Sequence, residues 1–158
     1  MASLDRALGV VVPIIEESGG QVELRGDELV GLWNTIKRHE DHMERAQTSA
    51  LEIAGALARD RSPAADAGLS GIFVRIGVAT GPATVGFVGP GNHGHVAVLG
   101  PAVVRAEELR SLCQVYGSQV VADQTIDSVL GYELDRRLFK GSQGPVQIYE
   151  LLCHADGA

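Results

Sequence analysis

Apolar residues recur at intervals of three and four positions in three stretches of the chain, the spacing of an amphipathic helix. The stretches are residues 4–18, residues 42–59 and a third that opens at Gly100-Pro101 and runs to about Val115. Because proline lacks a backbone N–H, we expect Pro13 to kink the first helix or to shift its start. The pair Gly19-Gly20 is expected to end that helix.

Other stretches alternate in polarity or are rich in β-branched residues, as β-strands are. Residues 21–25 and 28–33 flank a tight turn at Gly26-Asp27 and predict a β-hairpin. The glycine-rich residues 79–95 predict a second hairpin. Further strands are expected over 72–78, 96–99, 118–122, 132–139 and 145–151, with a loop over 60–70 and a short helix over 124–130 capped by Asp123. Helices alternate with strands and hairpins, which favours an α+β sandwich over a doubly wound sheet.

The composition is that of a globular protein of one domain. The chain has 158 residues, of which 45% are hydrophobic and 4% aromatic, and its formal net charge is −7. The negative charge and the scarcity of aromatic residues argue against nucleic-acid binding. No apolar run approaches the ~20 residues that span a bilayer, and the first residues do not form a signal peptide. We expect a soluble, intracellular domain over residues 1–152, without membrane insertion, and a C-terminal tail over 153–158.

The histidines and cysteines offer little chemistry of their own. His93 and His95 could ligate a metal together, but two histidines without a third ligand are more often exposed loop residues. Cys113 is expected to pack beneath its helix and Cys153 to be a free surface thiol. The glycine-rich segment lacks the Gly-Lys-Ser/Thr sequence of a phosphate-binding loop.

Five segments, in order along the chain, resemble segments of the class III nucleotidyl cyclases, the family of adenylate and guanylate cyclases. They are Gly19-Gly20 followed by Leu24-Arg-Gly-Asp-Glu28, and the stretches Arg75–Gly89, Val98–Leu109, Cys113–Ala122 and Leu138–Leu151. The resemblance covers residues 4–152. It implies an α+β, ferredoxin-like sandwich with an antiparallel-rich sheet, helices on one face of that sheet, and no counterpart of the family's first strand.

The resemblance also implies where a nucleotide would bind. The family forms its active sites at the interface of a head-to-tail dimer, where two aspartates hold two metal ions, Mg²⁺ or Mn²⁺. Asp27 matches the second of these aspartates, although Gly-Asp is also a common turn sequence. The other aspartate belongs to the strand that has no counterpart. Glu23 lies near the position that reads the purine, and Lys140 matches a lysine that contacts phosphate; the alternatives are an exposed strand glutamate and a solvated turn lysine.

Three positions depart from the family's pattern. Pro101 stands at the second purine-reading position, where it offers no side-chain donor or acceptor. Val104 stands where the family has a transition-state asparagine, and Glu108 stands where it has an arginine. A carboxylate there would repel the triphosphate. The neighbouring Arg105 and Arg110 point away from these positions, by about 100° per residue of a helix, so no residue of the chain is assigned a catalytic role.

These departures lead to one main hypothesis and two alternatives. The chain is expected to be inactive alone and to act as a regulatory or structural partner, in a homodimer or with another protein, through the cyclase dimer surface. The sheet edge left without the first strand would need covering, which favours a partner or a strand swap. Alternatively, the chain is a subunit that gives Asp27 and Lys140 to an active cyclase converting ATP or GTP to cyclic nucleotide. A third hypothesis is a nucleotide sensor, which ATP or GTP would stabilise against melting.

Overall fold

The computed structural model describes residues 2–59 and 73–153, which form three α-helices and eight strands. The helices are α1 (Ala2–Glu17), α2 (His42–Arg59) and α3 (Pro101–Tyr116). The strands are β1 (Gln21–Arg25), β2 (Glu28–Leu32), β3 (Ile76–Val78), β4 (Thr84–Val88), β5 (His95–Leu99), β6 (Val120–Ala122), β7 (Leu130–Arg137) and β8 (Val146–Leu152). Within these residues, no helix combines the length and the apolar composition that crossing a membrane requires.

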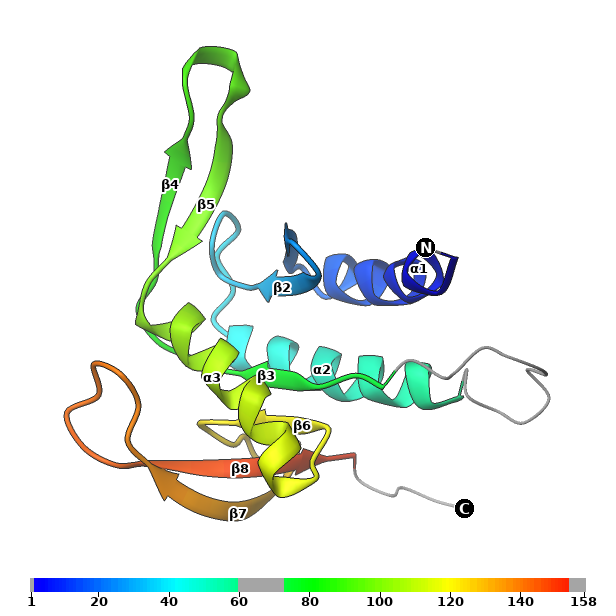
Figure 1. Ribbon diagram of the computed structural model, residues 1–158, viewed down its shortest axis with the longest axis vertical. Coiled ribbons are helices and arrows are strands. Elements are labelled where there is room, and N and C mark those ends of the chain that lie inside the picture. Colours follow the sequence, from blue (N-terminus) through cyan, green and yellow to red (C-terminus); the bar gives the residue numbers. More distant parts are fainter. Residues whose placement is uncertain (1, 60–72, 154–158) are drawn as a thin grey trace.

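The strands form one larger sheet and two hairpins. The sheet has the order β3-β6-β8-β7, in which β3 and β6 run parallel and the other neighbours run antiparallel. The strands β1 and β2 form one antiparallel hairpin, and β4 and β5 form another, joined at the tip by a single 3-10 turn at Gly91–His93. Figure 1 shows the β4–β5 hairpin extending away from the rest of the molecule. The α+β class and the antiparallel-rich sheets expected from the sequence are confirmed.

The helices α2 and α3 cover opposite faces of the four-stranded sheet. Val120 and Ala122 of β6 belong to a buried cluster with residues of α2. Val121, which lies between them, belongs to a separate buried cluster with residues of α3. Successive side chains of a strand point to opposite faces, so the expectation that the helices share one face of the sheet is wrong. Val120 to Ala122 are apolar at every position because this strand is buried on both sides.

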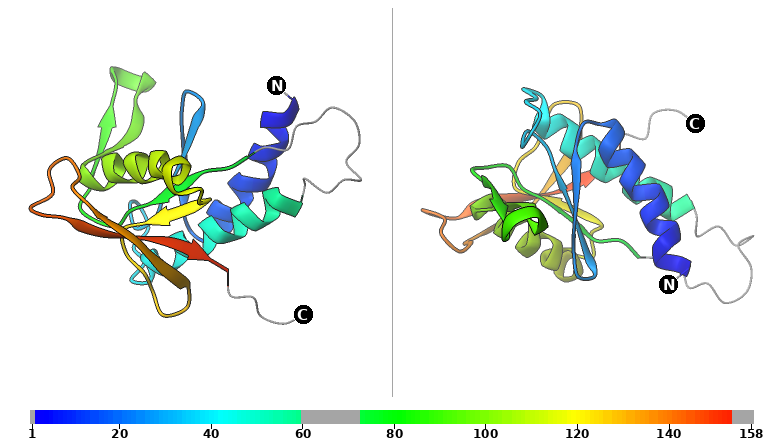
Figure 2. Two further views of the ribbon diagram at one scale, coloured as in Figure 1. Left: turned by 60° about the horizontal axis from the view of Figure 1, so that its bottom comes forward. Right: turned by 90° about the horizontal axis from the view of Figure 1, so that it is seen from above.

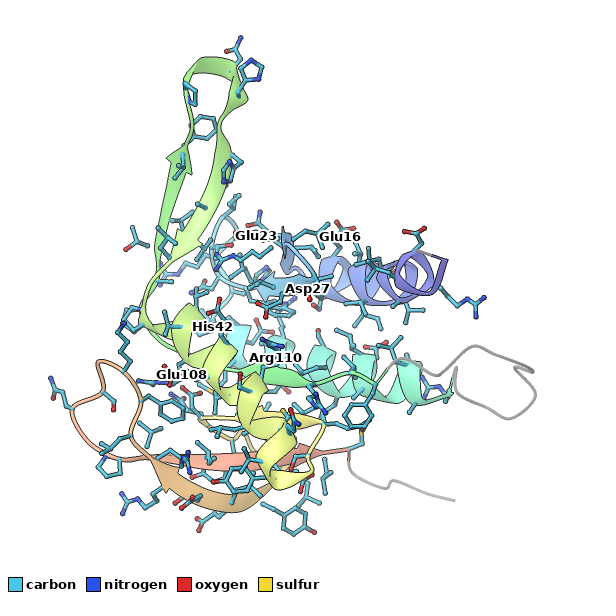
Figure 3. The ribbon with its side chains drawn as sticks, in the orientation of Figure 1. Glu16, Glu23, Asp27, His42, Glu108 and Arg110 are labelled. Carbon is cyan, nitrogen blue, oxygen red and sulfur yellow. The ribbon has the colours of Figure 1, made fainter. Side chains whose placement is uncertain are left out.

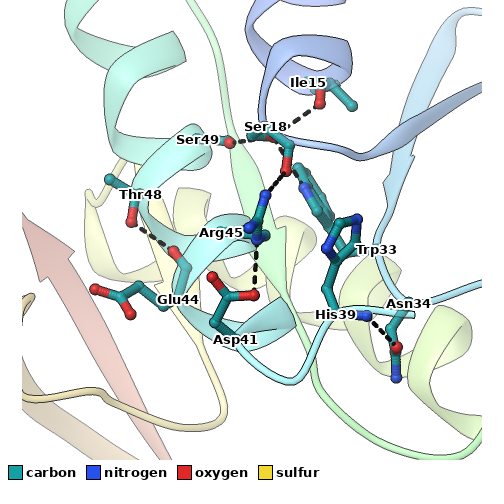
Figure 4. Close-up of polar contacts among 10 residues, drawn as sticks. All are labelled: Ile15, Ser18, Trp33, Asn34, His39, Asp41, Glu44, Arg45, Thr48 and Ser49. Atoms are coloured by element: carbon teal, nitrogen blue, oxygen red, sulfur yellow. Dashed lines mark hydrogen bonds and ion pairs between the residues drawn. The ribbon is translucent and has the colours of Figure 1, made fainter. Parts of the chain in front are cut away.

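The helix α1 packs on α2 and on the β1–β2 hairpin, and Ile76 of β3 packs against the same cluster (Figure 2). Pro13 lies inside α1, and the helix continues from Ala2 to Glu17 around it. Beyond its end, Gly19 adopts a φ of +82°, a conformation that glycine takes without strain. Ser18 ties this end to its neighbours: its hydroxyl donates to the Ile15 carbonyl at 2.7 Å and accepts from the Trp33 indole at 2.9 Å, as Figure 4 shows.

The prediction of a short helix over 124–130 is wrong. The segment after Asp123 is irregular apart from one turn at residues 127–128, and β7 begins at Leu130. The Gln47 side chain of α2 donates to the Gln124 carbonyl at 2.9 Å, and Val129 is buried in the cluster beneath α2. These tertiary contacts hold the segment in an irregular conformation that its local sequence did not indicate.

Several element boundaries also differ from the expected ones. The strand expected over 72–78 is shorter, since β3 begins at Ile76, and residue 72 lies outside the described residues, as does the loop expected over 60–70. The strand expected over 132–139 ends at Arg137. Phe139 instead enters a turn in which its N–H donates to the Ser142 hydroxyl at 3.2 Å, while its ring is buried against the α3 side of the sheet.

Candidate functional site

The β1–β2 hairpin carries two of the residues singled out in the sequence. The register pairs Glu23 with Val30 and Arg25 with Glu28, so these side chains share one face of the hairpin. The turn residue Gly26 has a φ of +66°, which suits glycine, and Asp27 beside it is exposed. Figure 3 shows Glu23 and Asp27 on this hairpin, and Glu108 and Arg110 on the neighbouring helix α3.

Glu23 is engaged by its own chain. The guanidinium of Arg25 donates to the Glu23 carboxylate at 2.7 Å and to the Val98 carbonyl of β5 at 2.6 Å. The third guanidinium nitrogen lies 3.6 Å from the carboxylate of Glu107 on α3. The hydrogen bond to Glu23 raises the pKa of Arg25, opposed by partial burial. The other Glu23 oxygen is buried and has no hydrogen-bond partner.

The two arginines of α3 also form ion pairs within the chain. Arg110 bonds the carboxylate of Glu28 on β2. Arg105 bonds the carboxylate of Asp123 at 3.3 Å, and its guanidinium lies 5.6 Å from the centre of the Phe139 ring. The arginines closest in sequence to Val104 and Glu108 are therefore already ion-paired with other residues of the chain.

Asp123 lies at the carboxyl end of β6, and Thr80 follows β3, which runs parallel to β6. These ends therefore meet, and the Thr80 N–H donates to the Asp123 carboxylate at 3.2 Å. The side chain of Asp123 is only 2% exposed. Burial raises the pKa of Asp123, and the hydrogen bonds from Arg105 and Thr80 oppose that rise.

Pro101, Val104 and Glu108 follow one face of α3 at i, i+3 and i+7, whereas Lys140 lies apart from the other predicted site residues. Val104 and Pro101 are exposed on α3, and Glu108 is half-buried there. Lys140 is exposed in the connection between β7 and β8, and Figures 1 and 2 keep this connection apart from the β1–β2 turn that holds Asp27. The single chain therefore does not place Asp27 and Lys140 around one ligand.

The carboxylates do not form a metal site within the described residues. No group of three or more His, Cys, Asp or Glu side chains in residues 2–59 and 73–153 is placed to hold a metal ion. Divalent cations such as Mg²⁺ are held by several oxygen ligands at once. Exposed Asp27 does not fit that requirement by itself. His93 and His95 are both exposed, as expected for loop and hairpin residues.

The two cysteines lie as expected: Cys113 is buried and Cys153 is exposed, and both are free. Burial raises the pKa of the Cys113 thiol.

The sequence did not reveal the roles of Arg25, Arg105, Arg110 and Asp123. The pairing of Glu23 with Arg25 had a local signal, since residues two apart on a strand share a face. The pairs Arg110–Glu28 and Arg105–Asp123 had none, because each joins elements that are far apart in the chain.

The β4–β5 hairpin presents an apolar face to solvent. Its register places Val85, Phe87, Val96 and Val98 on one side. Val98 is 1% exposed against the body of the protein, whereas Val85, Phe87 and Val96 are 41%, 66% and 43% exposed. An isolated two-stranded hairpin is only marginally stable in water. Exposed apolar patches are found at protein–protein interfaces and ligand-binding grooves.

Comparisons with known proteins relate this fold to cyclases. The chain is 27% identical over 144 residues to adenylate cyclase 1 of Rhizobium meliloti, a match that covers 88% of the chain and 22% of that protein. The adenylyl cyclase CyaB from P. aeruginosa superimposes with a TM-score of 0.83 at 19% identity, covering 99% of this chain and 84% of that one. The guanylyl cyclase Cya2 superimposes with a TM-score of 0.81 at 24% identity, covering 95% and 78%. No protein-family profile matches the chain.

These matches confirm the resemblance to class III cyclase domains at the level of the fold. The chain spans about a fifth of the length of the curated relative, so the similarity concerns a cyclase-type domain and not that whole protein.

Proposed function

We propose that this chain is a class III cyclase-type domain that forms no cyclic nucleotide by itself and acts as a regulatory or structural partner of a second cyclase-type domain. The observation that carries the proposal is the set of side chains on α3 and the ion pairs that they form. Val104 and Glu108 stand at the family's asparagine and arginine positions, and the helix's own arginines are paired with Glu28 and Asp123.

Losing the transition-state groups has a large effect on the activation free energy. One preorganised donor to a transition state is typically worth about 2.7–4 kcal/mol of activation free energy. Val104 offers no hydrogen bond. The carboxylate of Glu108 opposes the negative charge of a triphosphate. Releasing Arg105 would leave Asp123 buried without its ion-pair partner, which is costly.

The apolar face of the β4–β5 hairpin supports the second half of the proposal. It is formed by Val85, Phe87 and Val96 and stands away from the body of the protein (Figure 1). Burying apolar surface stabilises an interface by roughly 25 cal/mol per Å² before the costs of association. A second cyclase-type domain is the partner that the comparisons favour, because the neighbours in fold are cyclase domains.

Two observations favour a second candidate, a subunit of an active cyclase. Asp27 and Lys140 are both exposed and therefore accessible to a partner's nucleotide. The buried Glu23 oxygen without a partner is an acceptor that the donor groups of a purine could satisfy. In that case this chain would provide Asp27, Glu23 and Lys140 for binding, and the partner would provide the transition-state groups.

The first experiment measures cAMP and cGMP formed from Mn-ATP and Mn-GTP by the purified chain, with Asp27→Ala beside it. We expect no product from either protein. Product that the parent chain forms and Asp27→Ala does not form would overturn the claim of inactivity.

The second experiment mixes the chain with a purified active class III cyclase domain and measures association by sedimentation. Phe87→Lys is expected to weaken association at least tenfold, because it places a charge on the apolar face. Val115→Lys is the matched control, since Val115 is 68% exposed on α3 and lies off the hairpin. Equal association of the two variants would contradict a role for the hairpin. Turnover in the mixture that exceeds the partner's own activity and is lost with Asp27→Ala would select the active-subunit candidate.

A further inference from the structure

The connection between β7 and β8 (Figure 1) contains a closed turn that carries Lys140. The Ser142 N–H donates to the Phe139 carbonyl at 3.0 Å, and the Phe139 N–H donates to the Ser142 hydroxyl at 3.2 Å. Between them, Gly141 has a φ of +79°, which a type II turn requires of its third residue. Lys140 is therefore the second residue of a four-residue turn. Its exposed ammonium group has no hydrogen bond or ion pair with the described residues.

The first residue of this turn is anchored in the core. The Phe139 side chain is buried in the cluster to which α3 contributes Leu109 and Cys113. The guanidinium of Arg105 covers this ring at 5.6 Å from its centre. A cation over the face of an aromatic ring within about 6 Å is attracted to the ring. The preceding residue, Leu138, is 75% exposed, so Phe139 is the side chain that ties this end of the connection to the body of the protein.

Arg105 is itself held by the larger sheet. Its guanidinium bonds the Asp123 carboxylate at 3.3 Å, and that carboxylate accepts the Thr80 N–H at 3.2 Å. The Asp123 N–H in turn donates to the Val78 carbonyl at 3.2 Å. Asp123 and Thr80 follow the parallel strands β6 and β3. The position of the Arg105 side chain is therefore set by the carboxyl ends of two paired strands.

We propose that Arg105 is a positioning residue for Lys140. Held by Asp123, it covers the Phe139 ring, keeps that ring in the core, and so fixes the turn from which Lys140 presents its ammonium group. A lysine on a fixed backbone loses less conformational entropy on meeting an anion than a lysine on a mobile loop. The anion is a phosphate group of a nucleotide held by a partner, so the inference rests on the second candidate function, in which this chain contributes Lys140.

The test compares two variants of the chain by NMR relaxation of their backbone amides. Arg105→Ala combined with Asp123→Asn removes both charges of the pair together, so neither is left buried without a partner. Asp123→Asn alone is the matched control, because it keeps Arg105 over the ring and keeps an acceptor for its guanidinium. We expect the order parameters of Lys140, Gly141 and Ser142 to be about 0.85 in the control and below about 0.6 in the double variant.

Two further measurements separate positioning from a general loss of stability. The Val129 N–H closes another turn, with the Ile126 carbonyl at 3.1 Å, and is expected to keep its order parameter in both variants. Arg105→Lys keeps a cation for Asp123 and for the ring, and is expected to leave the turn as ordered as in the parent chain. Unchanged order over residues 140–142 in the double variant would overturn the proposal, as would an equal loss at Val129 or a loss of order in either single variant. No nucleotide or partner is present in this experiment, so its failure and that of the proposed function are distinguishable.

Discussion

At the scale of single residues, two arginines of α3 form ion pairs with carboxylates of other elements. Arg105 and Arg110 would be suitable ligands for phosphate if they were free. Both are instead paired with carboxylates of other elements, Asp123 and Glu28. The side chain at position 108 is acidic as well, and we expect its carboxylate to oppose the negative charge of a triphosphate.

We expect Asp123 to make the free energy of unfolding depend on pH. Its folded-state pKa is raised above the ordinary value of 3.8, chiefly by burial. The folded state therefore binds more protons than the unfolded state just above pH 3.8, and the contribution of Asp123 to stability falls as pH rises through that window. Asp123→Asn does not titrate there and keeps an acceptor for the Thr80 N–H.

We expect the free energy of unfolding of the parent chain, minus that of Asp123→Asn, to decrease as pH rises from about 3 to about 7. Urea denaturation at each pH measures it. Asp27→Asn is the control, since Asp27 is exposed, and its difference from the parent should vary less with pH. A difference that stays constant or grows with pH would contradict the assignment to Asp123.

At the scale of elements, close contacts of backbone with backbone determine where glycine is required. Gly77 is the middle residue of β3, and α3 lies directly on it. Gly86 is also a strand glycine, on β4, but a Cβ there would meet nothing within 4 Å. The two glycines therefore make a matched pair of substitutions.

Gly77→Ala is expected to lower the free energy of unfolding by about 1–3 kcal/mol, because the added methyl group forces α3 away from the sheet. Gly86→Ala is expected to change it by less than about 0.5 kcal/mol. Urea unfolding of both variants measures the contrast. Similar losses for the two substitutions would show that α3 does not lie as close to β3 as described.

The helices and strands also show how far local sequence patterns predict the fold. The hairpin over 21–32 and the helix over 42–59 were predicted closely, because their turn residues and apolar periodicity are local signals. The helix over 124–130 was not observed, because Gln47 bonds the Gln124 carbonyl from another element. The positions of α2 and α3 on opposite faces of the sheet also lay beyond local patterns, since the apolar residues of a helix do not say which face of a sheet the helix will cover.

At the scale of the whole molecule, a few polar contacts connect the β1–β2 hairpin to α3 and β5. Arg110 bonds Glu28, and Arg25 bonds both the Val98 carbonyl and Glu107. Since β2 does not pair with the larger sheet, these contacts and the apolar cluster of α1 and α2 hold the hairpin in place.

A double-mutant cycle of Arg110→Ala and Glu28→Ala should therefore show coupling. The pair is partly exposed, so we expect a coupling energy of about 0.2–1 kcal/mol in unfolding experiments, decreasing in high salt. Arg110→Ala combined with Glu108→Ala is the control and should be additive, because residues two apart on a helix do not face each other. Additivity of the Arg110 and Glu28 substitutions would show that the ion pair does not join the hairpin to α3.

The sequence by itself determined the order and type of most elements and the cyclase-type fold, because periodicity, turn residues and segment order are all properties of the linear chain. The hypothesis that Pro101, Val104 and Glu108 replace residues of the family's active site also came from the sequence and stays a prediction. The tertiary structure decided which charges are available: the partners of Arg105 and Arg110 come from segments 18 and 82 residues away along the chain. Only folding brings those groups within hydrogen-bonding distance.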